Sequence, residues 1–211
     1  GTNHMKWFAA IPEVEIVGLC DVDQLHLGEA KRNLDLLRPN NKATLHKDFR
    51  QILDRKDVDA ITCATPDHWH ATIATLAFQA GKDVYGEKPL SYDVKEGQKM
   101  LKALKRNKSI FQLGTQIHAT DNYHRVVEII RAGAIGKVHT VRLWKTGEPP
   151  IFSNPIVQEP PSQLDWDMWL GPAPYVDYMP EKCHFNYRYF LDYSGGVFVD
   201  FWCHIADVVF W

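Results

Sequence analysis

The sequence predicts an α/β fold built around a parallel β-sheet. Apolar runs of strand length recur through the first half of the chain, at 14–20, 57–64, 84–90 and 109–114. Amphipathic or alanine-rich stretches of helical length separate these runs, and the runs end at polar residues. Strand, polar loop, helix and strand again is the alternation that builds a parallel sheet.

The chain begins with a stretch that predicts little structure. Residues 1–5, Gly-Thr-Asn-His-Met, have the composition of a tag remnant. An amphipathic helix end follows at 6–11 and is broken by Pro12.

The first buried strand, 14–20, leads directly into Asp21. In a dinucleotide-binding fold, a carboxylate at such a strand end accepts hydrogen bonds from the adenosine ribose, so Asp21 is the candidate for that role. The alternative is that Asp21 caps the helix predicted over 24–36. Asp23 can supply that cap instead.

The next elements are a short strand at 43–45, a helix at 48–54 and a strong strand at 57–64. Residues 65–70, Thr-Pro-Asp-His-Trp-His, form a loop before the alanine-rich helix 71–80. Two histidines two residues apart on a loop do not share a face as a zinc-binding pair at i and i+4 would. No metal site is predicted here or elsewhere.

Glu87, Lys88 and Pro89 end the apolar run that starts at Val84. Proline pushes Lys88 into an extended conformation and fixes the turn that follows. A charged pair at the carboxyl end of a parallel strand lies where open α/β sheets bind ligands. A solvated pair in a surface turn is the alternative.

After a polar helix at 94–105, the strand 109–114 closes the first half of the chain. The second half begins with a helix over 121–131 that ends at Gly133. Residues 136–144 then alternate like a half-buried strand of an antiparallel sheet. The stretch 146–186 is rich in proline and aromatic residues, and serves as either a binding-loop wall or an oligomer contact.

The last apolar segment, 195–207, predicts a buried helix with three polar residues on one face. Asp200, His204 and Asp207 have the spacings four and three that align side chains along a helix. Buried without partners, they would cost several kcal/mol each, so they form either a structural polar network or a ligand site. With Lys88, they supply an amine, an imidazole and carboxylates, which can move a proton while a hydride leaves the adjacent carbon.

Composition excludes several classes of function. The chain has 211 residues, a net charge of -2 and a pI near 6.6, so nothing favours binding to nucleic acid or to an anionic membrane. No apolar run is long enough to span a bilayer. The four cysteines lack C-x-x-C spacing, which predicts reduced thiols packed in the core.

These motifs, taken in order, resemble the glucose-fructose oxidoreductase and inositol dehydrogenase family of nicotinamide-dependent oxidoreductases. The matching elements are Val17-Gly-Leu-Cys-Asp21, Ala64-Thr-Pro66 with His70, Gly86-Glu-Lys-Pro89, and Gly195-Gly196 followed by Asp200 and His204. The resemblance implies that Lys88, Asp200 and His204 form the catalytic centre. It also implies cofactor contacts from Asp21, Thr65, Pro66, His70, Glu87, Lys88 and Gln116.

The fold expected from this resemblance is a Rossmann-type parallel sheet over 1–116, followed by an α+β substrate-binding and oligomerisation domain over 117–211 with an open, mainly antiparallel sheet. The family's first strand and most of its Gly-rich loop are absent, and the chain stops at Trp211 before the second sheet can close. We therefore expect a fragment truncated at both ends. The cytoplasm is the default location, while the missing N-terminus leaves the periplasm or secretion open.

The expected activity is hydride transfer between a hydroxyl of a sugar, polyol or sugar derivative and NAD, in a protein that forms homo-oligomers. NAD is favoured over NADP because Asp21 would repel a 2′-phosphate. One alternative is a relative that uses NAD to cleave glycosides, although Lys88 favours a simple dehydrogenase. Another is a non-catalytic sugar-binding protein, and an intact G-x-G-x-x-G upstream of Gly1 would argue against it.

Overall fold

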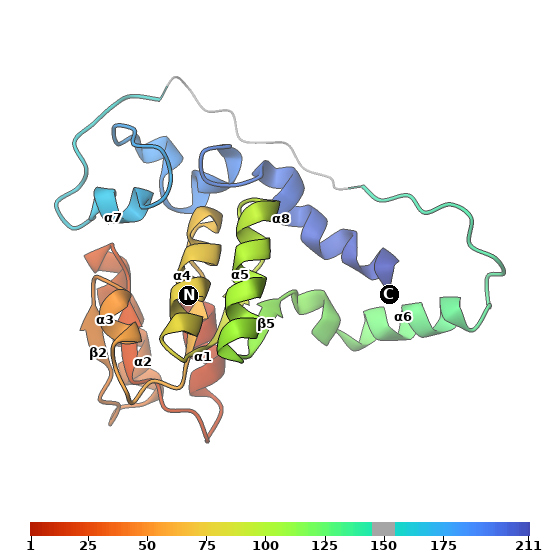
Figure 1. Ribbon diagram of the computed structural model, residues 1–211, viewed down its shortest axis with the longest axis horizontal. Helices are drawn as coiled ribbons and strands as arrows, with labels where there is room; N and C mark the ends of the chain where they lie inside the picture. The colour runs from red at the N-terminus through yellow and green to blue at the C-terminus, as the bar shows by residue number, and fades with distance from the viewer. Residues whose placement is uncertain (145–154) are drawn as a thin grey trace.

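The computed structural model describes residues 1–144 and 155–211 (Figure 1). Within these ranges the strands are β1 (Gly18–Cys20), β2 (Thr44–His46), β3 (Ala60–Cys63), β4 (Asp83–Glu87) and β5 (Phe111–Gly114). The α-helices are α1 (Thr2–Ala9), α2 (Gln24–Leu37), α3 (Arg50–Leu53), α4 (Asp67–Gln79), α5 (Val94–Asn107), α6 (Asp121–Arg131), α7 (Trp166–Leu170) and α8 (Gly196–Ile205). Short 3-10 turns are η1 (Gln116–Ala119), η2 (Pro180–Lys182), η3 (His184–Tyr189) and η4 (Asp207–Phe210).

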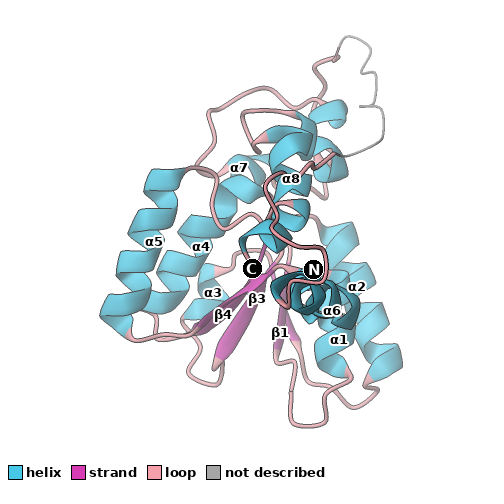
Figure 2. Ribbon diagram, turned by 90° about the vertical axis from the view of Figure 1, so that its right-hand side faces the viewer, coloured by secondary structure: helices cyan, strands magenta, loops and turns pink. Residues whose placement is uncertain are grey.

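Every strand pair in the described structure is parallel, as the sequence predicts for the first half of the chain. β1 pairs with β2, and a second sheet has the order β3-β4-β5. Figure 2 shows the strands between α4 and α5 on one side and α1 and α2 on the other. Parallel pairing through helical crossovers brings the carboxyl ends of neighbouring strands to one edge, where the motifs identified in the sequence also end.

The main core lies between the three-stranded sheet and the helices α4 and α5. Phe78, Ala77 and Met100 are fully buried there, and Val84 of β4 packs against them. Asp23 caps α2 by accepting a hydrogen bond from the Leu25 N–H at 2.8 Å, which confirms the cap assigned to it. Polar side chains thus fix where the helices begin, while apolar burial holds them on the sheet.

Residues 1–5, which have the composition of a tag remnant, are part of the fold, and the helix end predicted over 6–11 belongs to a helix that begins at Thr2. Residues 2–9 form α1, and His4 and Met5 are buried. Met5 packs in a small cluster with Leu34 of α2 and Ala43. The stretch looks like a tag remnant because it has few apolar residues, but tertiary packing covers one side of the helix.

Helix α4 begins at Asp67, four residues before the predicted start, so His68 and His70 lie on a helix and not on a loop. Pro66 occupies the N-cap position, and the Trp69 N–H donates to its carbonyl at 3.0 Å. Asp67, His68 and His70 are buried in this first turn, where Asp67 and His68 contact the second half of the chain and His70 contacts the Thr65 and Pro89 carbonyls. Their polarity reflects those contacts rather than solvent exposure.

The second half departs further from expectation. In the described ranges no strand follows Gly114, apart from an isolated antiparallel bridge between Asp23 and Leu164. The strand predicted over 136–144 is contradicted: the segment has no regular structure and is largely exposed. An alternating sequence forms a strand only where a neighbour pairs with its backbone, and the described residues offer none there.

The helix predicted over 121–131 is confirmed as α6, and α8 confirms most of the span of the predicted last helix. The prediction that this last helix is buried is wrong, because Asp200 is its only buried residue and Phe198 is 67% exposed. Between α6 and α8, the proline-rich stretch folds around an aromatic cluster that includes Trp166, Trp169 and Tyr193. The part of this stretch at 145–154 lies outside the described residues. Irregular backbone is therefore stabilised here by aromatic burial and not by a sheet.

Candidate active site

Lys88 and Asp200 meet at the carboxyl end of β4. The Lys88 ammonium donates to the Asp200 backbone carbonyl at 3.0 Å and also to the Asp200 carboxylate. Only 12% of the Lys88 side chain and 10% of the Asp200 side chain are exposed. Arg188 Nε lies 3.7 Å from the same carboxylate oxygen, so Asp200 stands between two cations. The sequence placed Lys88 and Asp200 in one site, and the structure brings them into contact across 112 residues.

Local backbone features hold the two elements in place. Gly86 lies under the Phe111 ring, which a Cβ at this position would approach to 2.9 Å, and the Lys88-Pro89 peptide is cis. At the start of α8, Gly196 has a φ of +78°, a conformation that glycine adopts readily. The close contact at Gly86 and the positive φ at Gly196 both fall on residues that the sequence motifs contain.

His204 follows Asp200 by one turn of α8 and is half-buried. Burial lowers the pKa of His204 below its ordinary value, and the nearby Lys88 ammonium lowers it further, while the Asp200 and Glu87 carboxylates oppose this. A histidine with a lowered pKa is neutral near pH 7 and can accept a proton. Lys88 already donates hydrogen bonds to two oxygens of Asp200, so its geometry suits donation to a substrate oxygen.

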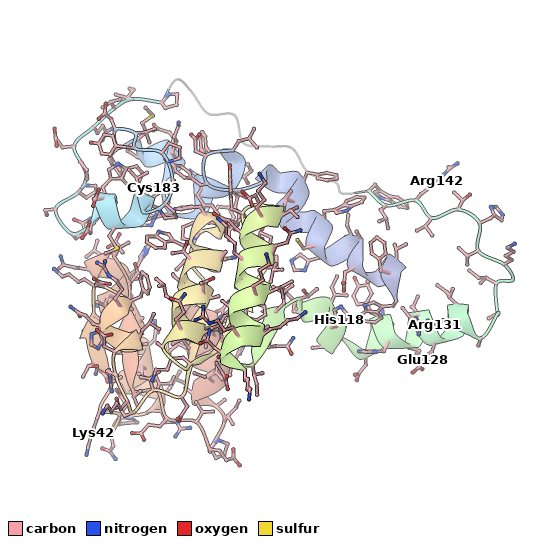
Figure 3. The ribbon with its side chains drawn as sticks, viewed as in Figure 1. Lys42, His118, Glu128, Arg131, Arg142 and Cys183 are labelled. Atoms are coloured by element: carbon pink, nitrogen blue, oxygen red, sulfur yellow. The ribbon has the colours of Figure 1, made fainter. Side chains whose placement is uncertain are left out.

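Asp207 does not join this group, contrary to the prediction that it shares a face with Asp200 and His204. Helix α8 ends at Ile205, and Asp207 begins the turn η4, where it pairs with His118. Asp207 lies beyond the end of α8 and pairs with His118, although its charge still raises the pKa of His204. Figure 3 shows His118 near the far end of α8, at the junction with α6.

The Glu87 carboxylate bridges the Lys88 backbone and α1: its Oε2 accepts a hydrogen bond from the Lys88 N–H at 3.2 Å. Its Oε1 lies 2.8 Å from His4 Nε2. Burial, the largest influence, would raise the pKa of Glu87, but the hydrogen bond to His4 and the charges of His4 and Lys88 together lower it. Nothing in the sequence marked His4 as a site residue, because residues 1–5 have the composition of a tag remnant.

The other predicted cofactor contacts lie at the ends of strands. Asp21 follows β1, and burial raises its pKa despite a hydrogen bond from the Asp23 N–H at 2.9 Å. Thr65 and Pro66 join β3 to α4, and Gln116 is exposed after β5. The N-terminus of α1 lies within electrostatic range of Asp21, Cys63 and Glu87. The ends of β1, β3 and β4 therefore converge around one place.

His70 is buried and bridges two of these loops. Its Nδ1 lies 2.7 Å from the Pro89 carbonyl oxygen, and its Nε2 lies 2.9 Å from that of Thr65. The ring thus ties the end of β3 to the turn that carries Lys88. The buried His70 ring thus helps to position the turn that carries Lys88, without itself facing solvent.

Sequence reasoning missed a buried carboxylate that joins the two halves of the chain. Asp67, at the first turn of α4, is 1% exposed. It accepts hydrogen bonds from the Tyr187 hydroxyl at 2.9 Å and from Ser194 Oγ at 2.6 Å. Burial and the Asp67 charge strongly raise the pKa of Tyr187, which keeps that hydroxyl a donor. Ser194 directly precedes the glycines that start α8, so Asp67 helps to place Asp200.

We expect Asp67→Asn to lower the free energy of unfolding by about 1–3 kcal/mol, because one hydroxyl loses a charged acceptor in a buried position. Asp121→Asn is the matched control, since Asp121 also begins a helix but is exposed. Denaturant unfolding of both variants and of the wild type measures the effect. Equal losses in the two variants would show that the Tyr187 and Ser194 contacts contribute nothing beyond the charge at a helix start.

The fold and this site define a dinucleotide-binding protein of the Rossmann type with a charged centre at the carboxyl edge of its sheet. Comparison with protein families makes the assignment specific. Residues 1–115 match the model of the oxidoreductase family with an NAD-binding Rossmann fold, which includes glucose-fructose oxidoreductase and inositol dehydrogenase, and residues 143–211 match that family's C-terminal α/β domain. The chain belongs to this family.

Individual relatives agree with the family. An inositol 2-dehydrogenase/D-chiro-inositol 3-dehydrogenase of Lactiplantibacillus plantarum is 25% identical over 176 residues, which cover 81% of this chain and 49% of that protein. A glycosyl hydrolase family 109 protein of Shewanella pealeana is 26% identical over 141 residues, covering 65% and 31%. The crystal structure of myo-inositol 2-dehydrogenase from Lactobacillus plantarum has a TM-score of 0.59 at 29% identity, covering 65% and 40%.

The chain spans about half the length, or less, of the curated relatives it matches. Across the described ranges, no helix has the length and apolar character needed to cross a membrane.

Proposed function

We propose that the protein is an NAD-dependent oxidoreductase that removes a hydride from a secondary hydroxyl carbon of a sugar, polyol or sugar derivative. The observation that carries this proposal is the meeting of Lys88 and Asp200, with His204 one turn away, at the carboxyl end of β4. Membership of an NAD-binding oxidoreductase family supports it, as does similarity to inositol dehydrogenases.

The residues at the strand ends fit a nicotinamide dinucleotide. Asp21 presents a carboxylate at the end of β1, where it would accept hydrogen bonds from the ribose hydroxyls. Strands β3 and β4 are parallel neighbours, with Cys63 opposite Gly86. The loop at Thr65 and Pro66 and the turn at Glu87 and Lys88 therefore lie next to each other at the carboxyl ends of these strands. We propose that residues 1–116 hold the nucleotide and that 117–211 complete the substrate site.

When bound, the nicotinamide supplies the acceptor for the hydride. Lys88 and Asp200 bind the substrate hydroxyls, with Lys88 donating to the oxygen that becomes a carbonyl. His204 takes the proton of that hydroxyl, because it is neutral near pH 7 whereas Lys88 is held as a donor. The C–H bond loses two electrons as hydride and the O–H bond loses a proton, which leaves a ketone.

An oxidation assay over a panel of sugars and polyols with NAD tests the proposal through the absorbance of reduced nicotinamide. We expect turnover with at least one cyclic polyol or sugar. Binding of panel members without reduction of NAD would favour a non-catalytic sugar-binding protein.

Similarity to a glycosyl hydrolase family 109 protein favours one second candidate, a glycosidase that recycles its NAD. Such an enzyme would release the leaving group from an aryl glycoside without net NADH formation. The same assay with an aryl glycoside therefore separates the two candidates.

We expect Asp21→Ser to lower the ratio of NAD to NADP catalytic efficiency at least about tenfold, because the carboxylate that would repel a 2′-phosphate is removed. Glu15→Gln is the control, since Glu15 is an exposed carboxylate near the opposite end of β1. Kinetics with each cofactor measure the ratio. A wild-type preference for NADP would contradict the role given to Asp21.

We also propose that the protein forms homo-oligomers. Apolar side chains exposed on α6 and α8, among them Ile129, Phe198 and Trp202, support this. Light scattering on the purified protein measures the oligomeric state.

A further inference from the structure

The first turn of α2 carries a group of metal-ligating side chains that the proposed hydride transfer does not use. Asp23, His26 and His184 each offer one atom, and these three atoms lie within 4.8 Å of one another. The two oxygens of Asp23 have separate roles: Oδ1 caps α2, while Oδ2 lies 3.2 Å from His184 Nε2. The carboxylate is therefore fixed in direction before any ligand binds.

Two distant segments of the chain build this cluster. Asp23 and His26 are three residues apart at the start of α2, a spacing that puts both side chains on the same side. His184 comes from η3 in the second half, and Cys183 before it is 2% exposed in the aromatic cluster. Figure 3 shows Cys183 beside α7, at the end of the molecule that also contains α2. The buried neighbour holds His184 in place.

The ligand set and spacing suit zinc. Zn²⁺ binds imidazole nitrogen and carboxylate oxygen at about 2.0–2.2 Å in a tetrahedron, whose ligand-to-ligand edges are then roughly 3.3–3.6 Å. The 3.2 Å between Asp23 Oδ2 and His184 Nε2 is close to such an edge. The His26 and His184 ring centroids are 4.5 Å apart, and one nitrogen of each ring lies within 4.8 Å of the other and of the Asp23 carboxylate.

We propose that Asp23, His26 and His184 bind a divalent transition-metal ion of the zinc class, with water at the fourth position. His26 is exposed, so solvent reaches the ion from that side. The ion fastens η3 to the first turn of α2, next to Asp21. The ion would link the two halves of the chain, because Asp23 and His26 lie in the first half and His184 in the second. The proposal does not depend on the proposed oxidoreductase activity.

Metal binding to chelator-treated, untagged protein tests this inference. Co²⁺ is added first and followed by visible absorption, and Zn²⁺ then competes for the same site. The variants are His26→Ala, which alters an exposed side chain, His184→Ala, and Asp23→Asn, which keeps an N-cap acceptor but removes the anionic ligand. His139→Ala is the control, because His139 is exposed and lies in the segment at the opposite end of the molecule from α2 (Figure 1).

We expect wild type and the His139→Ala variant to bind a single ion per chain with the absorption of tetrahedral Co²⁺. Each ligand variant should bind at least about tenfold more weakly. Zn²⁺ should also raise the melting temperature of wild type but not of the His184→Ala variant, since the ion joins two segments. Equal affinity in the wild type and all three ligand variants would overturn the proposal, and so would equal weakening in the His139→Ala variant.

Discussion

Lys88→Met is expected to lower turnover by about 10² or more, the usual scale for the loss of an acid–base or polarising group. The variant removes the ammonium that donates to Asp200 and, in the proposed reaction, to the reacting oxygen. Met keeps much of the side-chain volume, so packing around β4 changes little. Steady-state kinetics on an active substrate of the panel measure the loss.

Two further variants make this result specific. Lys95→Met removes an exposed lysine from the first turn of α5 and should leave turnover unchanged. Lys88→Arg keeps the positive charge but not the position of the donor, so we expect intermediate activity. Thermal melting of each variant shows whether the fold is intact. Wild-type turnover in a folded Lys88→Met protein would remove Lys88 from the mechanism.

His204→Asn is expected to lower catalytic efficiency about 10²–10⁴-fold and to remove the acidic limb of its pH profile. In the wild type, efficiency should rise with pH as His204 loses its proton. Because burial and Lys88 lower the pKa of His204 from 6.5, this limb lies below that pH and the plateau is reached near neutrality. His139→Asn, at an exposed histidine, should leave the profile unchanged.

Neighbouring charges should move the limb in opposite directions. Lys88→Met removes a cation that lowers the pKa of His204, so the limb of the residual activity shifts to higher pH. Asp200→Asn removes an anion that raises the same pKa, so the limb shifts to lower pH. If the limb survives in the His204→Asn variant and vanishes with Lys88→Met, Lys88 is the base and His204 is not.

The sequence alone determined the parallel α/β organisation and several of the residues at the edge of its sheet. Strand, helix and cap assignments rest on local physics: apolar runs, alanine-rich stretches and the Asp23 cap all act within a few residues. The motif around Lys88 and the glycine-led helix were visible for the same reason. Glycine, proline and charged residues at a strand end have few alternative uses.

Tertiary structure decided the features that depend on contacts across the chain. Asp200 reaches Lys88 over 112 residues, while Asp207, aligned with it in sequence, faces His118 because α8 ends first. The polar start of α4 is buried because Tyr187 and Ser194 satisfy Asp67.

The segment 136–144 is a case in which the sequence pattern predicts a strand and the tertiary structure does not form one. Its alternating pattern is real, but in the described structure no neighbouring strand pairs with it. Periodicity reports which face of a segment is apolar, whereas a strand also requires partners for its backbone hydrogen bonds. A sequence pattern records the preference of one segment, and only the fold supplies the partner that satisfies it.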